Sequence, residues 1–285
     1  MAEQSSDATE KSTEYQWNWD KSAAGWAKFF DKFERGAQCV SDRLIELARI
    51  QPGHRVLDVA TGIGEPAVTA ARRVAPNGLV IATDSAPQMI KLARARASAM
   101  GADRIEFREM DAQAPDLPES SFDAILCRWG LMFLRDLAGA LERMRRLLVP
   151  GGRIAVAVWS EALRVPMIGL MMDVCRRFDL PRLPPGTLGP LSLADTAALK
   201  RTFAAAGFAE IESESLTVTF EFASGDEYAL FQQRVLNPTV ELIGAQPAET
   251  QAKIWRSLAD STRPYLGADG VVRLPNECVC VAARR

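Results

Sequence analysis

The sequence predicts an α/β fold in which a mostly parallel sheet is covered by helices on both faces. From residue 55 onward, short β-rich runs alternate with segments whose apolar residues have helical spacing. The β-rich runs are themselves largely apolar, which is typical of parallel strands buried on both faces. The 285 residues, 48% of them hydrophobic, allow one large domain with a modest additional segment.

The expected elements follow in chain order. Residues 1–13 are polar and are expected to form a disordered tail, and residues 14–50 a helical segment. Five strands with three helices between them come next. The strands are expected at residues 55–60, 78–84, 104–111, 122–128 and 152–159. Pro66 and Pro87 stand near the starts of two of these helices, where the missing N–H of proline costs nothing.

The alternation changes after residue 160. Residues 161–192 and 225–265 are expected to be helical and to form a cap over the carboxyl ends of the strands, where open α/β folds bind ligands. Residues 193–224 are expected to add a helix and a strand to the sheet. Residues 266–285 are expected to add its final strand, at ECVCVAAR (277–284).

Composition argues against several functions. The net charge of −2 shows no basic excess for binding nucleic acid. The five cysteines show no CxxC spacing and no secretory signal precedes them, so we expect free thiols in the cytoplasm. No apolar run reaches the roughly 20 residues of a membrane span. His54 is the only histidine, so histidine-based catalysis is poorly supported and no metal is expected.

A loop with glycines joins the first strand to the first helix, and two interpretations of it compete. Residues 62–67 (GIGEPA) match the GxGxxA pattern of dinucleotide-binding loops, and Asp84 follows Gly64 by 84 − 64 = 20 residues, as a ribose-binding acid would. However, Asp58 and Glu65 flank the place where a pyrophosphate would lie. Two carboxylates repel a dianion at short range, so a cationic cofactor fits better.

Four motifs resemble those of the class I S-adenosylmethionine-dependent methyltransferases, in particular the ubiquinone/menaquinone C-methyltransferase-like group. They are VLDVATGIGEPA, IATDSAPQMIKLAR, FREMDAQAPDLPESSFDAILCR and LLVPGGRIAVAVW, and the resemblance covers roughly residues 40–160. It implies a methyltransferase with a Rossmann-like seven-stranded sheet, mostly parallel with an antiparallel last strand. Residues 51–160 would be its cofactor-binding core.

The resemblance implies S-adenosylmethionine as the cofactor. Asp84 would hold both ribose hydroxyls, Asp111 the adenine amino group, and Ala112 the adenine ring through its backbone. Ala60 stands where most members have glycine. The full expected cofactor set is Asp58, Ala60, Thr61, Gly62, Gly64, Asp84, Ser85, Met89, Asp111, Ala112 and Arg128.

Simpler roles are open for several of these residues. Each acid alone could be a helix cap or a turn residue, but all three follow strands at the edge where ligands bind, which favours a joint site. Arg128 is expected either in a salt bridge or, as we favour slightly, as a clamp on a carboxylate of the cofactor or substrate.

We expect the methyl acceptor to be an apolar or aromatic small molecule, such as a quinone, phenol or terpenoid, methylated at carbon or oxygen. The Met-rich segment 161–192 predicts an adaptable apolar pocket if it lines the site, although such segments usually pack a core. The expected substrate contacts are Trp129, Phe133, Trp159, Trp17 and Trp26. The last two belong to an aromatic group, with Tyr15 and Trp19, that either closes as a lid or packs on the core. Glu161 is the expected base if one is needed.

Two other functions stay open at this point. One is an NAD-dependent oxidoreductase that uses residues 62–67 and Asp84. The other is a protein that binds S-adenosylmethionine without transferring its methyl group. The sequence does not identify the acceptor or the oligomeric state.

Overall fold

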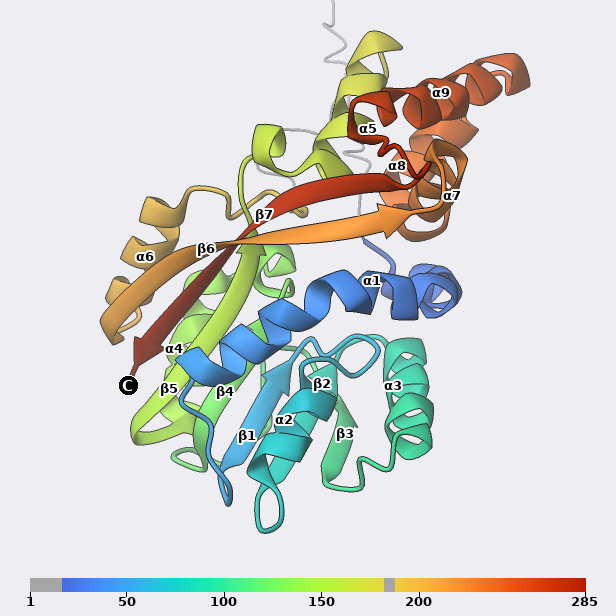
Figure 1. Ribbon diagram of the computed structural model, residues 1–285. Helices are drawn as coiled ribbons and strands as arrows, with labels where there is room; N and C mark the ends of the chain where they lie inside the picture. The colour runs from blue at the N-terminus through green and yellow to red at the C-terminus, as the bar shows by residue number, and fades with distance from the viewer. Residues whose placement is uncertain (1–16, 182–187) are drawn as a thin grey trace, which may run out of the picture.

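Seven strands form a single sheet, in the order β3-β2-β1-β4-β5-β7-β6, within the residues that the computed structural model describes, 17–181 and 188–285 (Figure 1). β7 is antiparallel to both of its neighbours, and the pairs among β1 to β5 are parallel. The predicted fold class is therefore confirmed, whereas the expected tail at 1–13 and Tyr15 lie outside the described residues. The strands are β1 (Arg55–Val59), β2 (Leu79–Asp84), β3 (Ile105–Glu109), β4 (Phe122–Arg128), β5 (Leu148–Trp159), β6 (Ala209–Phe222) and β7 (Val272–Arg284).

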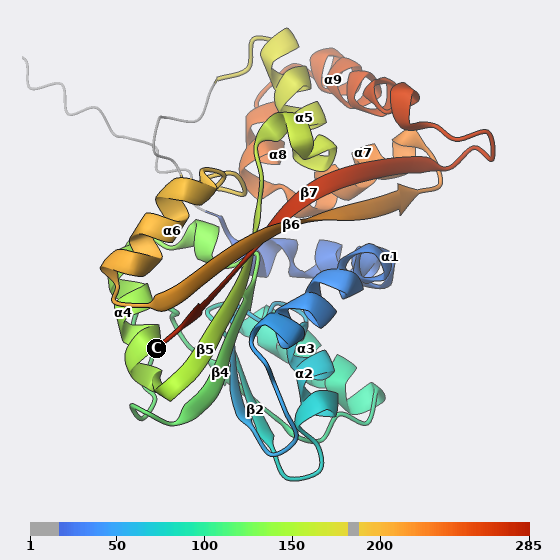
Figure 2. The same cartoon turned by 60° about the vertical axis from the view of Figure 1, so that its left-hand side comes forward.

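Helices cover both faces of the sheet and extend beyond one end of it (Figures 1 and 2). α1, α2 and α3 lie on one face, and α4 and α6 lie on the other. α5, α7, α8 and α9 gather beyond the carboxyl ends of the parallel strands. Their bounds are α1 (Trp19–Leu47), α2 (Ala67–Val74), α3 (Pro87–Ala99), α4 (Leu137–Leu147), α5 (Pro166–Arg177), α6 (Thr196–Ala205), α7 (Gly225–Val235), α8 (Asn237–Gly244) and α9 (Ala248–Ser261).

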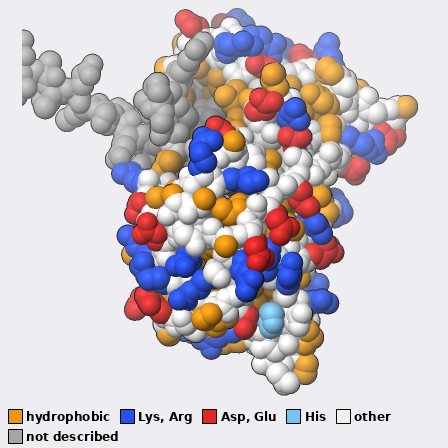
Figure 3. Space-filling model, turned by 90° about the vertical axis from the view of Figure 1, so that its left-hand side faces the viewer, with side chains coloured by type: hydrophobic (Ala, Val, Ile, Leu, Met, Phe, Trp, Pro, Cys, Tyr) orange, Lys and Arg blue, Asp and Glu red, His pale blue; other side chains and the backbone are white. Residues whose placement is uncertain are grey.

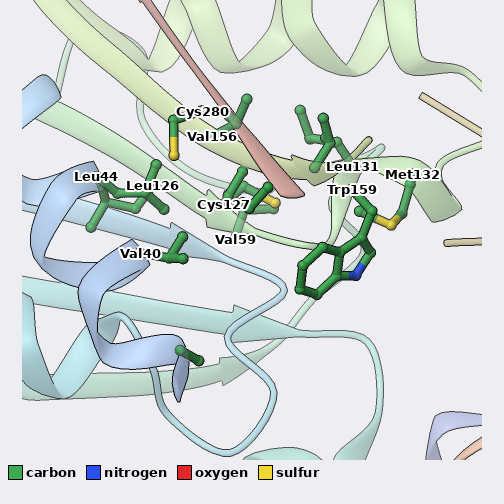
Figure 4. Packing of buried hydrophobic residues seen from close by; sticks show 14 of the residues in the cluster. Val40, Leu44, Val59, Leu126, Cys127, Leu131, Met132, Val156, Trp159 and Cys280 are labelled. Carbon is green, nitrogen blue, oxygen red and sulfur yellow. The ribbon is translucent and has the colours of Figure 1, made fainter. Parts of the chain in front are cut away.

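The long helix α1 begins at a capped residue and buries one face. The Asn18 side chain accepts a hydrogen bond from the Lys21 N–H at 3.0 Å, which satisfies a free donor of the first turn. Apolar residues then recur at helical spacing. Figure 4 shows two of them, Val40 and Leu44, directed toward Leu126 of β4, so the carboxyl half of α1 packs on the centre of the sheet.

Two strands are longer than predicted because of their pairing partners. β5 begins at Leu148, which pairs with Phe122 of β4 across a register shift. β7 begins at Val272, which pairs with Phe222 of β6, and the two strands stay paired along almost their whole length. Local sequence around Pro150 and Pro275 favours a turn or a strand edge. Pairing with a neighbour, which is not visible locally, extends both strands.

A buried polar network fastens the beginning of α5 to the sheet. The Met167 N–H donates to Asn276 Oδ1 on β7 at 2.8 Å. The Met167 carbonyl accepts from the Tyr228 hydroxyl at 2.8 Å and from Gln232 Nε2 at 2.6 Å, both on α7. Because buried polar groups are costly unless paired, this network fixes α5 and α7 relative to β7.

The surface is mixed in charge. Lys and Arg side chains are interspersed with Asp and Glu on the face shown in Figure 3, so this face carries no extended field of one sign. Among the described residues, no helix combines the length and apolar character needed to cross a membrane.

Candidate cofactor site

A cavity of about 260 Å³ opens at the carboxyl ends of the central strands, against the amino-terminal half of α1. Most of the expected site residues line it. They are Ala60, Thr61, Gly62, Asp84, Ser85, Met89, Asp111, Ala112 and Arg128 from the cofactor set, and Trp26, Trp129 and Phe133 from the substrate set. The expected residues that do not line it are Asp58, Gly64, Trp159, Trp17 and Glu161.

The loop after β1 is held in an unusual backbone conformation. Ala60, Gly62 and Gly64 have φ of 55°, 57° and 94°, a region that costs a residue with a Cβ about 1–2 kcal/mol. At Gly62 a Cβ would meet no atom within 4 Å, so the backbone there faces open space that a ligand can occupy. Gly64 lies behind the loop, where a Cβ would come within 3.4 Å of Ala93 on α3.

Gly130 explains how alanine is accommodated at position 60. A Cβ placed on Gly130 would lie 2.5 Å from the Ala60 Cβ, which is shorter than any real contact. Gly130 follows β4 and lines the same cavity. The Ala60 side chain in the first loop is therefore matched by a missing side chain at Gly130 in the loop after β4.

Asp84 connects the first two loops of the site. Its Oδ2 accepts from the Gly62 N–H and its Oδ1 from the Ala86 N–H, both at 2.9 Å. The side chain is 8% exposed and lines the cavity, and this burial raises the pKa of the carboxyl. A carboxylate has about four acceptor positions, so two remain for hydroxyl groups of a ligand.

Asp58 is fully buried behind the loop. Its Oδ2 accepts from the Thr61 hydroxyl at 2.6 Å, and its Oδ1 has no hydrogen-bond partner in the described part of the chain. Burial raises the pKa of this carboxyl to about 7. Thr61 lines the cavity, whereas Asp58 does not, and the unpaired Asp58 Oδ1 is buried behind Thr61.

Glu65 does not play the electrostatic role that the sequence suggested. Its side chain is 1% exposed and forms an ion pair with Arg96 of α3 at 3.0 Å. It also accepts from the Thr69 hydroxyl at 2.7 Å. Its charge is compensated inside the protein, so the argument from two flanking carboxylates was wrong for Glu65. Asp84 and Asp111 also line the cavity, and neither forms an ion pair within the described part of the chain.

Arg128 adopts the salt-bridge arrangement, not the carboxylate clamp that the sequence slightly favoured. Its Nη1 donates to Glu34 Oε1 at 2.8 Å and its Nη2 to Glu34 Oε2 at 2.7 Å. Nη1 also donates to the Ser41 hydroxyl at 2.8 Å. Arg128 therefore ties α1 to the end of β4, and its guanidinium is not free to clamp a ligand with both arms.

An aromatic wall closes the cavity. One stripe of α1 supplies Trp19, Trp26, Phe30 and Phe33, and the loop after β4 supplies Trp129 and Phe133. Phe30 and Phe33 were not predicted as site residues, and Trp19 was expected only as part of a group that closes as a lid or packs on the core. The spacing of 19, 26, 30 and 33 is nevertheless helical and marks one face. Glu65, which the sequence placed beside the ligand, also lines the cavity, and the lining residues without a sequence signal are Ile63, Met110, Gln113, Gly130 and Leu134.

Two aromatic residues that were predicted to contact the substrate, Trp159 and Trp17, lie behind this wall. Trp159 stacks on Trp129 with centroids 4.4 Å apart, and Trp129, held at φ 59°, also meets Phe33 edge-on at 5.5 Å. Trp17 stacks on Trp19 at 5.3 Å. Trp17 and Trp159 thus support the lining aromatics without facing the cavity.

The structure does not bring Glu161 to the cavity. Its side chain is 61% exposed and pairs with Arg164 at 3.1 Å. No described residue between 161 and 181 or between 188 and 192 lines the cavity, because α5 packs against α9 and β7. The expected base and the described part of the Met-rich segment therefore lie away from the cavity.

Comparison with known proteins relates the chain to methyltransferases. Residues 56–152 match a family described as "Methyltransferase domain". The chain is 40% identical over 113 residues to aklanonic acid methyltransferase from Streptomyces sp. strain C5, covering 40% of this chain and 51% of that protein. It is 36% identical over 118 residues to a ubiquinone/menaquinone biosynthesis C-methyltransferase from Pseudomonas putida, covering 41% of this chain and 46% of that protein. The chain thus spans about half the length of the relatives it matches.

A solved structure matches along almost the whole chain. It is a SAM-dependent methyltransferase from Aquifex aeolicus, with a TM-score of 0.56 and 15% identity, covering 94% of this chain and 99% of that one. At this identity the match supports the fold alone.

Asp58 predicts a measurable pH dependence of stability. Its pKa is about 7 in the folded protein and near 3.8 when exposed, because burial disfavours the charged form. Between pH 4 and 7 the folded state therefore binds more protons than the unfolded state, and the free energy of unfolding falls as pH rises, by up to about 1.4 kcal/mol per pH unit from this group. Asp58→Asn removes this contribution, so urea unfolding at pH 4, 5.5, 7 and 8 will show a shallower decline in the variant. Parallel curves for the two proteins would contradict the assignment.

Proposed function

We propose that this chain methylates a carbon or oxygen of an aromatic small molecule. The proposal takes as its premise that the chain is a class I S-adenosylmethionine-dependent methyltransferase related to the ubiquinone/menaquinone C-methyltransferases. One observation carries the proposal. One cavity is lined both by an open glycine loop with Asp84 and Asp111 and by a group of aromatic rings.

The carboxylate side of the cavity fits the cofactor. Asp84 keeps free acceptor positions for ribose hydroxyls, and the open backbone at Gly62 admits the methionine portion. Asp111 and Ala112 line the cavity where the adenine is expected. S-Adenosylmethionine supplies there a methyl group already activated on a sulfonium. The protein must hold the acceptor in line with it and exclude water.

The aromatic side fits a flat, apolar acceptor. Trp26 and Phe33 of α1 line the cavity together with Trp129 and Phe133 of the loop after β4, and Phe33 meets Trp129 edge-on at 5.5 Å. Aromatic faces stack on planar rings and gain affinity beyond the area that they bury. The names of the two relatives, for aklanonic acid and for ubiquinone/menaquinone biosynthesis, support an acceptor of this class.

No base is needed from the protein if the acceptor is acidic. The charged side chains that line the cavity already have partners in the protein. Glu65 binds Arg96, Arg128 binds Glu34, and Asp84 accepts from two backbone N–H groups. Asp111 Oδ1 accepts from the Gln113 N–H at 2.8 Å. The proposed acceptor therefore arrives as a phenolate or an enolate, and the wall positions it.

A panel of acceptors tests this proposal. The protein is incubated with S-adenosylmethionine and hydroxyquinones, dihydroxynaphthalenes, simple phenols or amines, and products are identified by mass spectrometry. Methylation of acidic hydroxyaromatics, at a rate that follows the ionised fraction of the acceptor, is expected. Methylation of amines alone would contradict the substrate class. Binding of S-adenosylhomocysteine with no methylation across the panel would favour a non-catalytic role.

Trp129→Ala separates acceptor binding from cofactor binding. Removing this ring takes away the surface that Phe33 and Trp159 hold in place, and we expect kcat/KM for the best acceptor to fall about 100-fold. The Kd for S-adenosylhomocysteine, measured by calorimetry, should change much less. Trp255→Ala, in the cap and away from the cavity, is the matched control. Equal losses of turnover and cofactor affinity in the Trp129 variant would remove this residue from the acceptor wall.

A further inference from the structure

Arg128 presents an electrostatic problem for the proposed cofactor. Arg128 is one of the residues that line the cavity, and its guanidinium carbon lies over the ring of Trp129, another lining residue, 5.1 Å from the ring centroid. S-Adenosylmethionine carries an ammonium, a carboxylate and a sulfonium, so its net charge is +1. S-Adenosylhomocysteine, the product, lacks the sulfonium and is neutral overall. An uncompensated cation in the wall would oppose binding of the substrate form and leave the product form nearly unaffected.

Glu34 is the charged partner that compensates Arg128. The two side chains form a two-armed ion pair with N–O distances of 2.7 and 2.8 Å, and they are 9% and 5% exposed. The other acceptors of this guanidinium, the Ser41 hydroxyl and the Ala37 carbonyl, are neutral. Glu34 itself does not line the cavity.

The nearby carboxylates cannot replace Glu34 without leaving their own partners. Glu65 is paired with Arg96 at 3.0 Å. Asp58 accepts a hydrogen bond from the Thr61 hydroxyl at 2.6 Å, and it interacts with Arg128 electrostatically without a hydrogen bond. The charged groups around the guanidinium are thus Glu34, Asp58 and Glu65, and only Glu34 is hydrogen-bonded to it.

We propose that Glu34 is a positioning residue that acts through Arg128 to set the charge of the cavity, and thereby lets the protein bind the sulfonium cofactor in preference to its neutral thioether product. The inference rests on the proposed function, because it takes S-adenosylmethionine as the ligand. It assigns a role to a helix residue that does not touch the cavity.

The test compares two ligands that differ in one charge. Calorimetry at pH 8, where Asp58 is mostly ionised, gives Kd for S-adenosylmethionine and S-adenosylhomocysteine. In Glu34→Gln, the ratio of the Kd for S-adenosylmethionine to the Kd for S-adenosylhomocysteine is expected to be about tenfold higher than in wild type. The ligand carboxylate is common to both molecules, so altered contacts with it cancel in the ratio. Sinefungin, in which a protonated amine replaces the methylsulfonium, is expected to follow S-adenosylmethionine.

Two further variants separate charge from structure. Ser41→Ala removes a hydrogen bond to Arg128 without changing any charge, so it should leave the ratio unchanged even where both Kd values rise. The double variant Glu34→Gln/Arg128→Gln removes both charges of the pair, and its ratio should return to within about threefold of wild type. It also keeps the proposal testable if Glu34→Gln folds poorly because of its unpaired buried cation.

The outcomes distinguish this inference from the proposed function. If wild type binds neither ligand, the proposed function fails. If wild type binds both and Glu34→Gln weakens both equally, Glu34 only fastens α1 to the sheet and the inference is overturned. A raised ratio in Glu34→Gln that is reversed in the double variant supports it.

Discussion

Gly130→Ala is expected to lower the affinity for S-adenosylhomocysteine by about 100-fold or more, because even a 1 Å displacement of a binding loop can have an effect of this size. The new Cβ would lie 2.5 Å from the Ala60 Cβ and 2.8 Å from Cys127 Sγ. Cys127 is fully buried in the sheet and cannot move freely. The first loop must therefore shift, and Ala60 and Gly62 with it.

The variant Ala60→Gly supplies a rescue for Gly130→Ala. It removes the atom in closest conflict and places glycine at φ 55°, where alanine is strained. In the double variant, calorimetry is expected to show that a large part of the affinity is recovered. Part of the loss remains because the new Cβ still conflicts with Cys127 Sγ. Gly244→Ala, where a Cβ meets no atom within 4 Å, is the control for a general glycine effect. Wild-type affinity in Gly130→Ala, or no recovery in the double variant, would contradict the matched fit of the two loops.

Asp84→Ala is expected to lower cofactor affinity by about 3 kcal/mol, or more than 100-fold, because hydrogen bonds to a charged group are worth about 1.5–3 kcal/mol each. The substitution leaves the Gly62 and Ala86 N–H groups without their acceptor and removes the proposed partner of the ribose hydroxyls. Calorimetry with S-adenosylhomocysteine measures the loss.

A matched control for Asp84 lies at the opposite end of the same sheet. Asp123 Oδ2 accepts from the Arg55 N–H at 2.8 Å, so Asp123→Ala also removes an acceptor of a backbone N–H group. It should lower stability with little effect on the Kd. Similar affinities for the two variants would show that Asp84 is not at the binding site.

The sequence predicted the sheet because its signals are local. Apolar runs and the glycine loop identify β1, β2 and β4, and parallel strands bring Asp84 and Asp111 to the same edge as the loop. The extra length of β5 and β7 escaped prediction because it comes from pairing with β4 and β6.

Partners of charged residues could not be read from the sequence. Arg128 binds Glu34, which is 94 positions away, and Glu65 in the loop before α2 binds Arg96 of α3, which is 31 positions away. Glu161 follows directly after a strand, as a site residue often does, yet its side chain turns to solvent and pairs with Arg164. Position along a strand predicts which edge a residue occupies, whereas its partner depends on how α1 and α3 pack.

The most direct test of the account is calorimetry of the wild-type protein with S-adenosylhomocysteine and with NAD. The loop at 60–64, Asp84 and the ion-paired Arg128 define a cavity suited to the methionine-containing cofactor, so micromolar binding of S-adenosylhomocysteine and no detectable binding of NAD are expected. Binding of NAD without S-adenosylhomocysteine would contradict the assignment of this cavity and every prediction based on it.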